Sequence, residues 1–479
     1  MTDAPRPDAA PGWTPAVAAA IEVETTGDAL PRTEWMVVLA EVPATARRGR
    51  EVPVVSALRP LEPRAGEEVL AHVSVGSRDR PVLAVRRGPD GTRVRSGLDL
   101  SALATETTLA RVLARVVSGV EPTTRTLGVG VVGYGPFGGM GHTHGLAATE
   151  TAGLEFVAAA DRDRARLKAA TEDFPGIAVY EDVAELARDE DVDVAIVAVP
   201  PAYHAELGRQ LLDAGKHVVL EKPMCLTAAD ADDLLARAAD AGRVVTVHQS
   251  RRWDRDFLTL RRVVEQGLLG EVFSIETFVG TYDHPCREWH SDVGPSGGAI
   301  YDWGSHHVDW ILRLYGGELP QTVRCTGHKR VWHDITNLDQ LTLHLTWADG
   351  REAMFRQSDV AAIRRPKFHV QGTLGTLEGH YRPLRTERLE PGRGYVDHES
   401  HHAEAPVDLR VVTHQTGVGL SERLLPPAPH PGWGFHVNLA DHLLLGEPLD
   451  VEPTQPRDVV AVLEAGHRSA AEGGSLVHP

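Results

Sequence analysis

Between residues 126 and about 250, short apolar runs alternate with amphipathic segments. Strands are predicted from Thr126 toward Gly133 and then over four further ranges: 154–160, 192–199, 216–220 and 244–248. Helices are predicted over 164–171 and 204–212, where apolar residues recur with helical spacing. Continuous apolar strands are typical of a parallel sheet that is buried on both faces. The alternation of strand and helix therefore predicts a doubly wound α/β domain.

After about residue 270 the pattern changes to strict alternation of apolar and polar positions. Strands with this period are predicted over 272–279, 340–346 and 367–371. In such strands one face is buried and the other is exposed to solvent, which predicts a large open antiparallel sheet with one face covered. Two helical segments, around 436–445 and 457–471, close the chain.

The residues before about 120 form a third pattern. Strand-like runs occur at 35–39, 52–56, 68–74 and 81–85, followed by a hairpin turn at Asp90-Gly91 and a helix at 108–117. Residues 1–14 are rich in Pro, Ala and Asp and are predicted to be disordered. The predicted organisation is a tail (1–14), an accessory α/β region (15–122), a doubly wound domain (123–250) and a domain with the open sheet and the closing helices (251–479).

Composition narrows the classes of function. The 479 residues carry a net charge of −18 and no long basic run, so nucleic-acid binding is not expected. No apolar run approaches the roughly 18 residues of a membrane span, and no signal peptide is evident. Cys225, Cys286 and Cys325 are too widely spaced for a disulfide framework or a metal knuckle. These observations predict a cytoplasmic protein.

A glycine-rich motif follows the first strand of the doubly wound domain and indicates that this domain (123–250) binds a dinucleotide. Gly133, Gly135 and Gly138 form G-x-G-x-x-G, with Pro136 and Phe137 inside the loop. The first glycine permits a sharp turn, the second lets the backbone approach a pyrophosphate, and the third lets the helix pack closely. The free N–H groups of that helix then face the phosphates.

Asp161 ends the second strand, about 20 residues after the glycines, where an acidic residue binds the adenosine ribose. A carboxylate there repels a 2′-phosphate, so NAD is the expected cofactor. Arg162 follows directly and could instead meet a 2′-phosphate, which keeps NADP as the alternative.

Two further groups carry chemistry. Glu221-Lys222-Pro223 follows a strand, and a lysine at that edge can stabilise negative charge on a substrate oxygen. If residues 302–306 are helical, Asp302 and His306 share one face, and the histidine can act as a general base. Taken singly, each group also fits an ordinary structural role: a surface lysine before a turn, and a polar contact on a helix.

Together these motifs resemble the Gfo/Idh/MocA oxidoreductases from about residue 126 to the end of the chain. The resemblance implies a Rossmann domain plus an α/β domain whose open antiparallel sheet mediates homo-oligomerisation. It also implies that Lys222, Asp302 and His306 are catalytic, that Glu221 lies at the cofactor, and that the Lys222–Pro223 bond is cis.

One stretch departs from the family's Thr-Pro-Asn-x-x-His pattern. Here the chain reads Val199-Pro200-Pro201-Ala202-Tyr203-His204, so Pro201 replaces the asparagine that would approach the nicotinamide ribose. Val199, Pro200 and His204 keep their places, and His204 fits a structural role at the start of a helix.

Expected substrate contacts come from residues after the last parallel strand and from a polar, aromatic stretch. The candidates are Gln249, Arg252, Trp289 and Tyr301. Surface pairing of the arginines 251 and 252 is an equal alternative for those two positions, and an interface loop is the alternative for residues 282–290.

Histidines elsewhere were weighed as metal ligands. His398, His401 and His402 lack regular ligand spacing, which predicts a solvated loop and no metal. For His142 and His144, beside the glycine loop, local packing or cofactor contact is expected, so no metal site is predicted.

The region before residue 120 lies outside the Gfo/Idh/MocA resemblance. Its strand order, its Asp-Gly turn and its closing helix are similar to the last half of ThuA-like, glutamine-amidotransferase-like domains. It has no nucleophilic cysteine, so the similarity implies a truncated, non-catalytic remnant.

The leading hypothesis is an NAD(P)-dependent dehydrogenase that acts on a secondary alcohol of a sugar, inositol or related polyol. An NAD-dependent glycoside hydrolase with an oxidation–elimination cycle would use the same fold. The third hypothesis is a non-enzymatic NAD(P)-binding regulator that uses its N-terminal region to bind a partner.

Overall fold

The computed structural model describes residues 15–39, 50–75, 78–105, 107–119, 125–135, 139–285, 289–382, 384–390, 394–400, 407–428 and 432–479. These residues form two compact units. The first contains the described residues up to Thr126 together with 151–154 and 439–447, and the second contains the remainder.

The first unit is built on a six-stranded sheet of order β1-β6-β5-β4-β2-β3. Its strands are β1 (Ile21–Val23), β2 (Leu30–Leu39), β3 (Arg50–Leu58), β4 (Glu68–Val75), β5 (Arg78–Gly88) and β6 (Gly91–Ser96). Its helices are α1 (Pro15–Ala19), α2 (Leu100–Thr105) and α3 (Thr107–Ser118). The β1–β6 pair is parallel, and the other pairs are antiparallel. The predicted strands and closing helix of this region are confirmed, while its resemblance to ThuA-like domains stays a prediction.

The hairpin of this sheet turns one residue earlier than predicted. Gly88 pairs with Gly91, so the turn residues are Pro89 and Asp90. Gly91 has a φ of 102°, a conformation that favours glycine.

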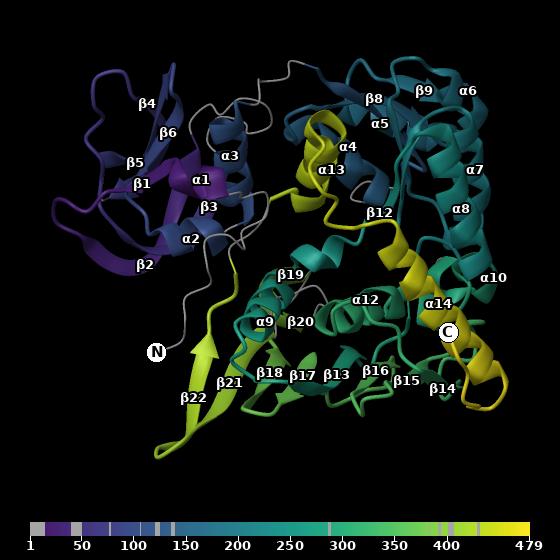
Figure 1. The fold of residues 1–479 in the computed structure, drawn as a ribbon. Helices are drawn as coiled ribbons and strands as arrows, with labels where there is room; N and C mark the ends of the chain where they lie inside the picture. Colours follow the sequence, from purple (N-terminus) through teal and green to yellow (C-terminus); the bar gives the residue numbers. More distant parts are fainter. Residues whose placement is uncertain are drawn as a thin grey trace. The chain divides into compact units, whose positions relative to one another are not determined.

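The second unit begins with a parallel sheet of order β12-β11-β10-β7-β8-β9 (Figure 1). The strands are β7 (Leu127–Val132), β8 (Leu154–Ala160), β9 (Ala178–Tyr180), β10 (Val194–Val197), β11 (His217–Leu220) and β12 (Val245–Val247). The accompanying helices are α4 (Met140–Glu150), α5 (Arg164–Asp173), α6 (Val183–Arg188), α7 (His204–Asp213) and α8 (Ala228–Ala241). Every residue of β7 and β10 is buried, as their continuous apolar sequences predicted.

Local sequence explains where these helices begin and end. The side chains of Asp163 and Thr227 accept backbone N–H groups at the N-termini of α5 and α8. Gly242 ends α8 in the left-handed region, with a φ of 61°.

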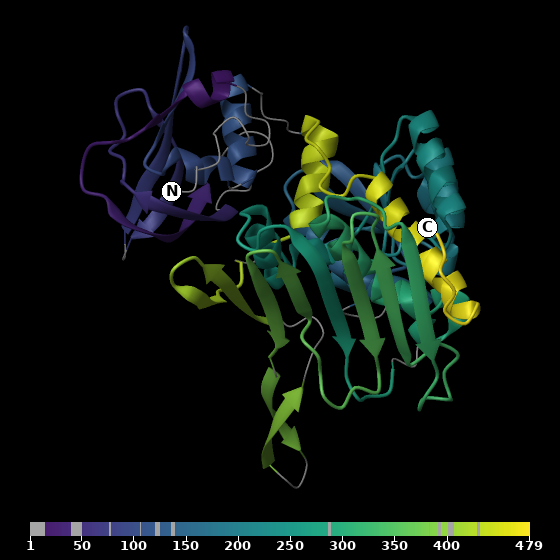
Figure 2. The ribbon, with the colours of Figure 1, turned by 60° about the horizontal axis from the view of Figure 1, so that its bottom comes forward.

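The rest of this unit contains an eight-stranded sheet of order β14-β15-β16-β13-β17-β18-β21-β22, which Figure 2 shows as an open fan. The strands are β13 (Val272–Gly280), β14 (Thr322–His328), β15 (Gln340–Thr346), β16 (Glu352–Ser358), β17 (Phe368–Gly372), β18 (Gly375–Tyr381), β21 (Val407–Gln415) and β22 (Gly419–Leu425). The sheet is antiparallel apart from the parallel β13–β16 pair. The associated helices are α9 (Arg255–Glu265), α10 (Val293–Ser296), α11 (Ala299–Asp302), α12 (Gly304–Leu314), α13 (Gly434–Leu445) and α14 (Thr454–Ala471). The predicted open sheet and both closing helices are therefore confirmed.

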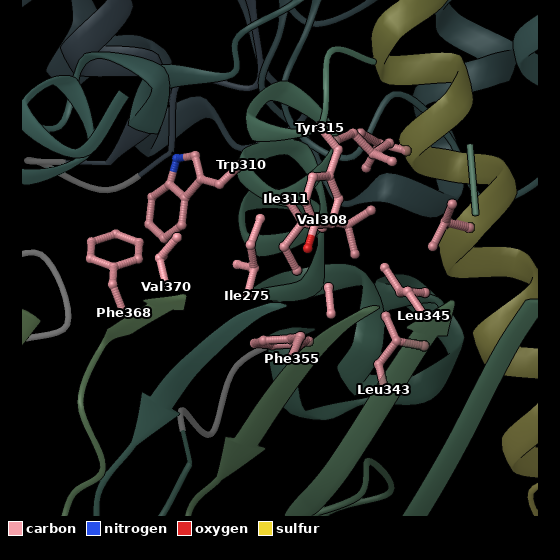
Figure 3. Packing of buried hydrophobic residues seen from close by; sticks show 14 of the residues in the cluster. Ile275, Val308, Trp310, Ile311, Tyr315, Leu343, Leu345, Phe355, Phe368 and Val370 are labelled. Carbon is pink, nitrogen blue, oxygen red and sulfur yellow. The ribbon is translucent and has the colours of Figure 1, made fainter. Parts of the chain in front are cut away.

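The core of this part lies between α12 and the sheet (Figure 3). Trp310 and Ile311 of α12 are at most 1% exposed and pack in one cluster with Ile275 and Phe355 from the strands. Each such side chain contributes about 1.5–3 kcal/mol by leaving water. This packing holds α12, and with it His306, firmly against the sheet.

One predicted loop is a strand. Residues around His398 were expected to be a solvated loop, but β19 (Leu384–Glu390) and β20 (Gly394–Ser400) pair as an antiparallel ribbon. Figure 2 shows this ribbon extending away from the fan. The prediction failed because backbone pairing stabilises a ribbon even where the sequence is polar. His401 and His402 lie outside the described residues, as do Cys286 and the predicted tail.

Within the described part of the chain, no helix combines the length and the apolar character that crossing a membrane requires.

Candidate active site

The predicted site residues meet at the carboxyl ends of the parallel strands. Gly133 follows β7, Asp161 follows β8, Val199 and Pro200 follow β10, and Lys222 follows β11. In an open α/β sheet this edge is where ligands bind.

The first glycine of the motif permits a close turn. Gly133 has a φ of 88°, and a Cβ atom there would lie 2.6 Å from the Ala198 carbonyl oxygen and 2.7 Å from the Val199 side chain. Any larger residue would therefore push apart the ends of β7 and β10.

The close helix contact predicted for Gly138 is observed at Gly141. A Cβ atom at Gly141 would lie 2.2 Å from the Tyr134 carbonyl oxygen, so this glycine lets α4 approach the turn. Gly138, Pro136 and Phe137 lie outside the described residues. The sequence offers several glycines before α4, and only the position of the helix start at Met140 identifies the one in contact.

Gly135 opens the space that a pyrophosphate requires. Its φ is 74°, and among the described residues, chain neighbours aside, no atom lies within 4 Å of the position that a Cβ atom would take. Its N–H lies 3.3 Å from Oδ2 of Asp161, whose Oδ1 accepts the N–H of Asp163 at 2.9 Å. Arg162 is exposed beside them. The glycine turn, the open space and the acid after β8 fit a nicotinamide dinucleotide.

Lys222 and Asp302 form the central ion pair of the site. Lys222 Nζ donates to Asp302 Oδ1 at 2.7 Å, and the two side chains are 21% and 27% exposed. Burial by itself would raise the pKa of Asp302, but the neighbouring Lys222 ammonium outweighs it and the pKa lies below its usual value. The Asp302 carboxylate is thus kept ionised, and both side chains reach solvent. The Lys222–Pro223 bond is cis, as the family resemblance implied.

His306 lies one helical turn beyond Asp302. The two residues belong to α11 and α12, which meet at Trp303, so the predicted helical spacing is confirmed. No hydrogen bond joins them within the described part of the chain, because Asp302 turns to Lys222 instead. His306 is 4% exposed and its Nδ1 atom lacks a hydrogen-bond partner there. Burial, followed by the positive charges of Lys222 and Arg251, holds the pKa of His306 well below its usual value.

Two predicted cofactor contacts face inward. Glu221 Oε1 lies 2.9 Å from Nε2 of His144 and 2.7 Å from Nδ1 of His248, and its Oε2 accepts the N–H of Lys222 at 3.1 Å. His204 is fully buried, and its nitrogens lie 2.8 Å from the carbonyl oxygens of Val199 and Pro223. Both side chains therefore hold the loops that carry the site.

The predicted substrate contacts divide into two groups. Gln249 is 1% exposed and neither its amide oxygen nor its amide nitrogen has a partner within the described part of the chain, so it can receive a ligand. Arg252, by contrast, is 5% exposed and occupied by Asp309, the Asp450 carbonyl and Gln455. Its buried pairing opposes the predicted substrate contact.

Of the two predicted aromatic contacts, Tyr301 has a structural role and Trp289 remains available to a ligand. Tyr301 is 3% exposed and donates its hydroxyl to the Leu226 carbonyl at 2.8 Å, which is a structural role. Trp289 is partly exposed and stacks on His290 with 3.7 Å between ring centroids.

Two further charged residues lie near the site: Arg251, for which a ligand contact and surface pairing were equal alternatives, and Asp359, which the sequence did not indicate. The Arg251 guanidinium lies 4.8 Å from the ring centre of Trp303 and influences the pKa values of both Asp302 and His306. Burial raises the pKa of Asp359 to about 7, and the charge of Asp302 adds to the effect. These effects arise from burial and from charges that are distant along the chain, so spacing along the sequence gave no signal for them.

Comparison with known proteins identifies the architecture. The family described as "Oxidoreductase family, NAD-binding Rossmann fold" matches residues 127–249, and the "GFO/IDH/MocA C-terminal domain" matches residues 257–378. A scyllo-inositol 2-dehydrogenase (NADP(+)) of Bacillus subtilis is 26% identical over 355 residues, which cover 74% of this chain and 96% of the relative.

A relative that matches over a shorter stretch and a solved structure are also similar to this chain. An inositol 2-dehydrogenase of Salmonella paratyphi B is 30% identical over 195 residues, covering 39% of this chain and 55% of the relative. The crystal structure of an NAD-binding protein from Listeria innocua has 26% identity and a TM-score of 0.60, covering 74% of this chain and 97% of that one. The chain is an oxidoreductase of the Gfo/Idh/MocA family, with an additional N-terminal unit.

Proposed function

We propose that this enzyme transfers a hydride between a nicotinamide cofactor and a secondary alcohol of a sugar, inositol or related polyol. The relatives named as inositol dehydrogenases support this substrate class. The observation that carries the proposal is the 2.7 Å Lys222–Asp302 pair, which lies one helical turn from a buried His306.

Lys222 has the role of binding the reacting oxygen. Its ammonium group lies at a partly exposed position, so a hydroxyl or carbonyl oxygen can approach it. A fixed positive charge there stabilises the alkoxide character that develops as the C–H bond breaks. Asp302 holds the ammonium group in place by accepting its hydrogen bond at 2.7 Å.

His306 has the role of general base. Its low pKa means that the imidazole is neutral near pH 7 and can take the hydroxyl proton. The proton moves from the substrate oxygen to His306 as the hydride leaves the carbinol carbon. The unpaired Nδ1 atom is consistent with an acceptor that gains its partner only when substrate binds.

The bound nicotinamide ring supplies the hydride acceptor. We expect Gly133, Gly135, Asp161, Val199 and Pro200 to form the binding surface for the whole dinucleotide. A carboxylate after β8 favours the two free ribose hydroxyls of NAD. NADP is the alternative, since Arg162 is exposed and the Bacillus subtilis relative is named for NADP(+).

Substrate hydroxyl groups have buried polar partners available. Gln249 offers both a donor and an acceptor, and Trp289 offers a flat apolar face of the kind that suits a ring.

We further propose that the enzyme acts in the cytoplasm and forms a homo-oligomer through the open sheet. Leu420 and Leu424 of β22, in that sheet, are 76% and 75% exposed, as apolar residues at an interface would be in a single chain.

The test follows the absorbance of the reduced nicotinamide. Full-length protein is mixed with NAD or NADP and a panel of inositols, sugars and sugar derivatives. The proposal expects reduction with a subset of the panel, and its loss in Lys222→Met. Silence across the panel, with cofactor retained by the protein, would contradict a dehydrogenase and favour the hydrolase or regulator.

A further inference from the structure

Three buried histidines from distant parts of the chain come together beside Glu221, the residue before Lys222. His144 belongs to α4, His248 follows β12, and His436 belongs to α13, elements that lie near one another in Figure 1. One ring nitrogen of each lies within 4.8 Å of the other two. The three side chains, which we call the histidine cluster, are 0%, 6% and 1% exposed. Within the described part of the chain, this is the one group of three or more such side chains with metal-ligand spacing.

The carboxylate of Glu221 orients two of these rings. It lies 2.9 Å from Nε2 of His144 and 2.7 Å from Nδ1 of His248. A carboxylate accepts hydrogen bonds, so in the neutral rings these two nitrogens carry the protons. The lone pairs are then on Nδ1 of His144 and Nε2 of His248. A histidine that donates one ring N–H to a carboxylate and presents its other nitrogen is the usual arrangement of a metal ligand.

The third ring faces one of these lone pairs. Nε2 of His436 lies 3.0 Å from Nδ1 of His144. Two nitrogen lone pairs at that distance repel each other unless a proton or a cation lies between them. A proton on His436 would satisfy these two rings, but it gives no role to His248, whose ring centre lies 4.6 Å from that of His144 and 5.4 Å from that of His436.

We propose that His144, His248 and His436 bind a divalent transition-metal ion, with Zn²⁺ as the first candidate. Imidazole nitrogens are preferred ligands of this class, at about 2.0–2.1 Å from Zn²⁺. Tetrahedral ligands then lie about 3.3 Å apart, so small side-chain rotations within the observed 4.8 Å complete the site. The buried anion Glu221 offsets part of the cation's charge.

The position of the site suggests a structural ion. It joins α4, the end of β12 and α13 to Glu221, which directly precedes Lys222. Metal binding would therefore fix the loop that presents the catalytic lysine. The sequence indicated packing or cofactor contact for His144 and no metal, because 292 residues separate it from His436.

Metal binding is measured on the full-length protein after treatment with a strong chelator and dialysis. Zn²⁺ is titrated by calorimetry, and Co²⁺ is titrated as a spectroscopic probe, since tetrahedral Co²⁺ has intense visible absorption. We expect one equivalent of either ion, a raised melting temperature with Zn²⁺, and Co²⁺ absorption of the tetrahedral type.

Variants locate the ion. His436→Phe keeps a ring of similar size and should weaken Zn²⁺ binding by at least about 100-fold, and Glu221→Gln should weaken it about 10–100-fold. His142→Phe, a partly buried histidine on the same helix, is the matched control and should bind like the wild type. Circular dichroism checks that each variant is folded.

The outcomes are distinct and none depends on turnover. Stoichiometric binding that is lost in His436→Phe and kept in His142→Phe supports the site. Absence of tight Zn²⁺ and Co²⁺ binding by the wild type would overturn it and leave a hydrogen-bonded histidine chain. Binding that persists unchanged in folded His436→Phe would also overturn it.

Discussion

Lys222 and Asp302 form a 2.7 Å ion pair although 80 residues separate them along the chain. Lys222 follows the parallel strand β11, and Asp302 ends α11 above the eight-stranded sheet. The pair therefore joins the dinucleotide-binding part to the part that contributes the proposed substrate surface. Its two groups remain 21% and 27% exposed, which distinguishes it from the fully buried Arg252–Asp309 pair.

Replacing Lys222 tests the proposed oxyanion role. Lys222→Met keeps the length of the side chain and removes the charge, so we expect kcat to fall about 10²–10³-fold. Lys168→Met, at an exposed position on α5, is the control and should leave kcat unchanged. Initial rates of nicotinamide reduction measure both, and a Lys222→Met enzyme with wild-type kcat would remove Lys222 from the mechanism.

His306 should show its role in the pH profile. Burial first, and then neighbouring positive charge, lowers its pKa, so the neutral base persists as pH falls below 6.5. We therefore expect kcat/KM to stay flat between about pH 6.5 and 8 and to fall only at lower pH. His306→Gln should lose about 10²–10⁴-fold in kcat at every pH. An acidic limb centred at or above pH 6.5 that disappears in His306→Gln would show that the pKa is not lowered.

Asp161 should decide cofactor preference. Asp161→Ala removes the carboxylate after β8, so we expect KM for NAD to rise about tenfold or more while that for NADP falls or stays constant. Asp163→Ala is the control from the same loop, since it caps α5 and should cost about 1 kcal/mol of stability without changing preference. Equal effects of Asp161→Ala on both cofactors would argue against the ribose contact.

Gly141 should resist substitution although it lies in a helix. Alanine usually stabilises a helix interior by about 1 kcal/mol relative to glycine. Here the added Cβ would lie 2.2 Å from the Tyr134 carbonyl oxygen, so we expect Gly141→Ala to destabilise the protein by about 1–3 kcal/mol and weaken cofactor binding.

The control for this substitution is Gly242→Ala at the left-handed end of α8. In the part of the chain that the structure describes, no atom other than those of its chain neighbours lies within 4 Å of its Cβ position. The variant should therefore lose about 1–2 kcal/mol through backbone strain and bind cofactor normally. Urea unfolding and cofactor titration measure both effects. A Gly141→Ala protein more stable than the wild type would contradict the contact.

Asp359 should make stability depend on pH. Burial raises its pKa to about 7, and the charge of Asp302 adds to the effect, whereas the unfolded value is about 3.9. A raised carboxyl pKa means that ionisation destabilises the folded state. The loss of stability grows from about pH 4 to pH 7, at roughly 1.4 kcal/mol for each pH unit and thus to at most about 4 kcal/mol.

Asp359→Asn removes that ionisation. The variant should be more stable than the wild type at pH 8 and about equally stable at pH 4.5, as measured by urea unfolding at both values. A difference between the two proteins that does not change with pH would show that Asp359 does not titrate in this range.

Much of the fold was predictable because its signals are local. The apolar runs that became β7, β8 and β10, and the alternating run that became β15, carry their burial pattern in a few residues. The run at 272–279 predicted the strand β13 but not its burial, because Thr277, Phe278 and Val279 are all buried in succession. The ends of α8 are also marked by local chemistry: Thr227 caps its N-terminus with a side-chain oxygen, and Gly242 ends it in the left-handed conformation. For the site, the strand-end positions of Asp161 and Lys222 followed from the same local reading.

The remainder depends on contacts between distant residues. Arg251 and Arg252 are adjacent and chemically alike, but only the fold determines that Arg252 pairs with Asp309 while Arg251 lies over Trp303. The helix spacing of Asp302 and His306 was local, whereas the preference of Asp302 for Lys222 was not. The β19–β20 ribbon has no apolar alternation to indicate it.

The transfer of a labelled hydride tests the proposed reaction most directly. Full-length protein is incubated with NAD and a reactive polyol that carries deuterium at the carbinol carbon, and the reduced cofactor is analysed by mass spectrometry. The proposed function predicts one deuterium in each reduced nicotinamide, in equal amount to the ketone product. Product formation without net reduced cofactor, or reduced cofactor without deuterium, would contradict it.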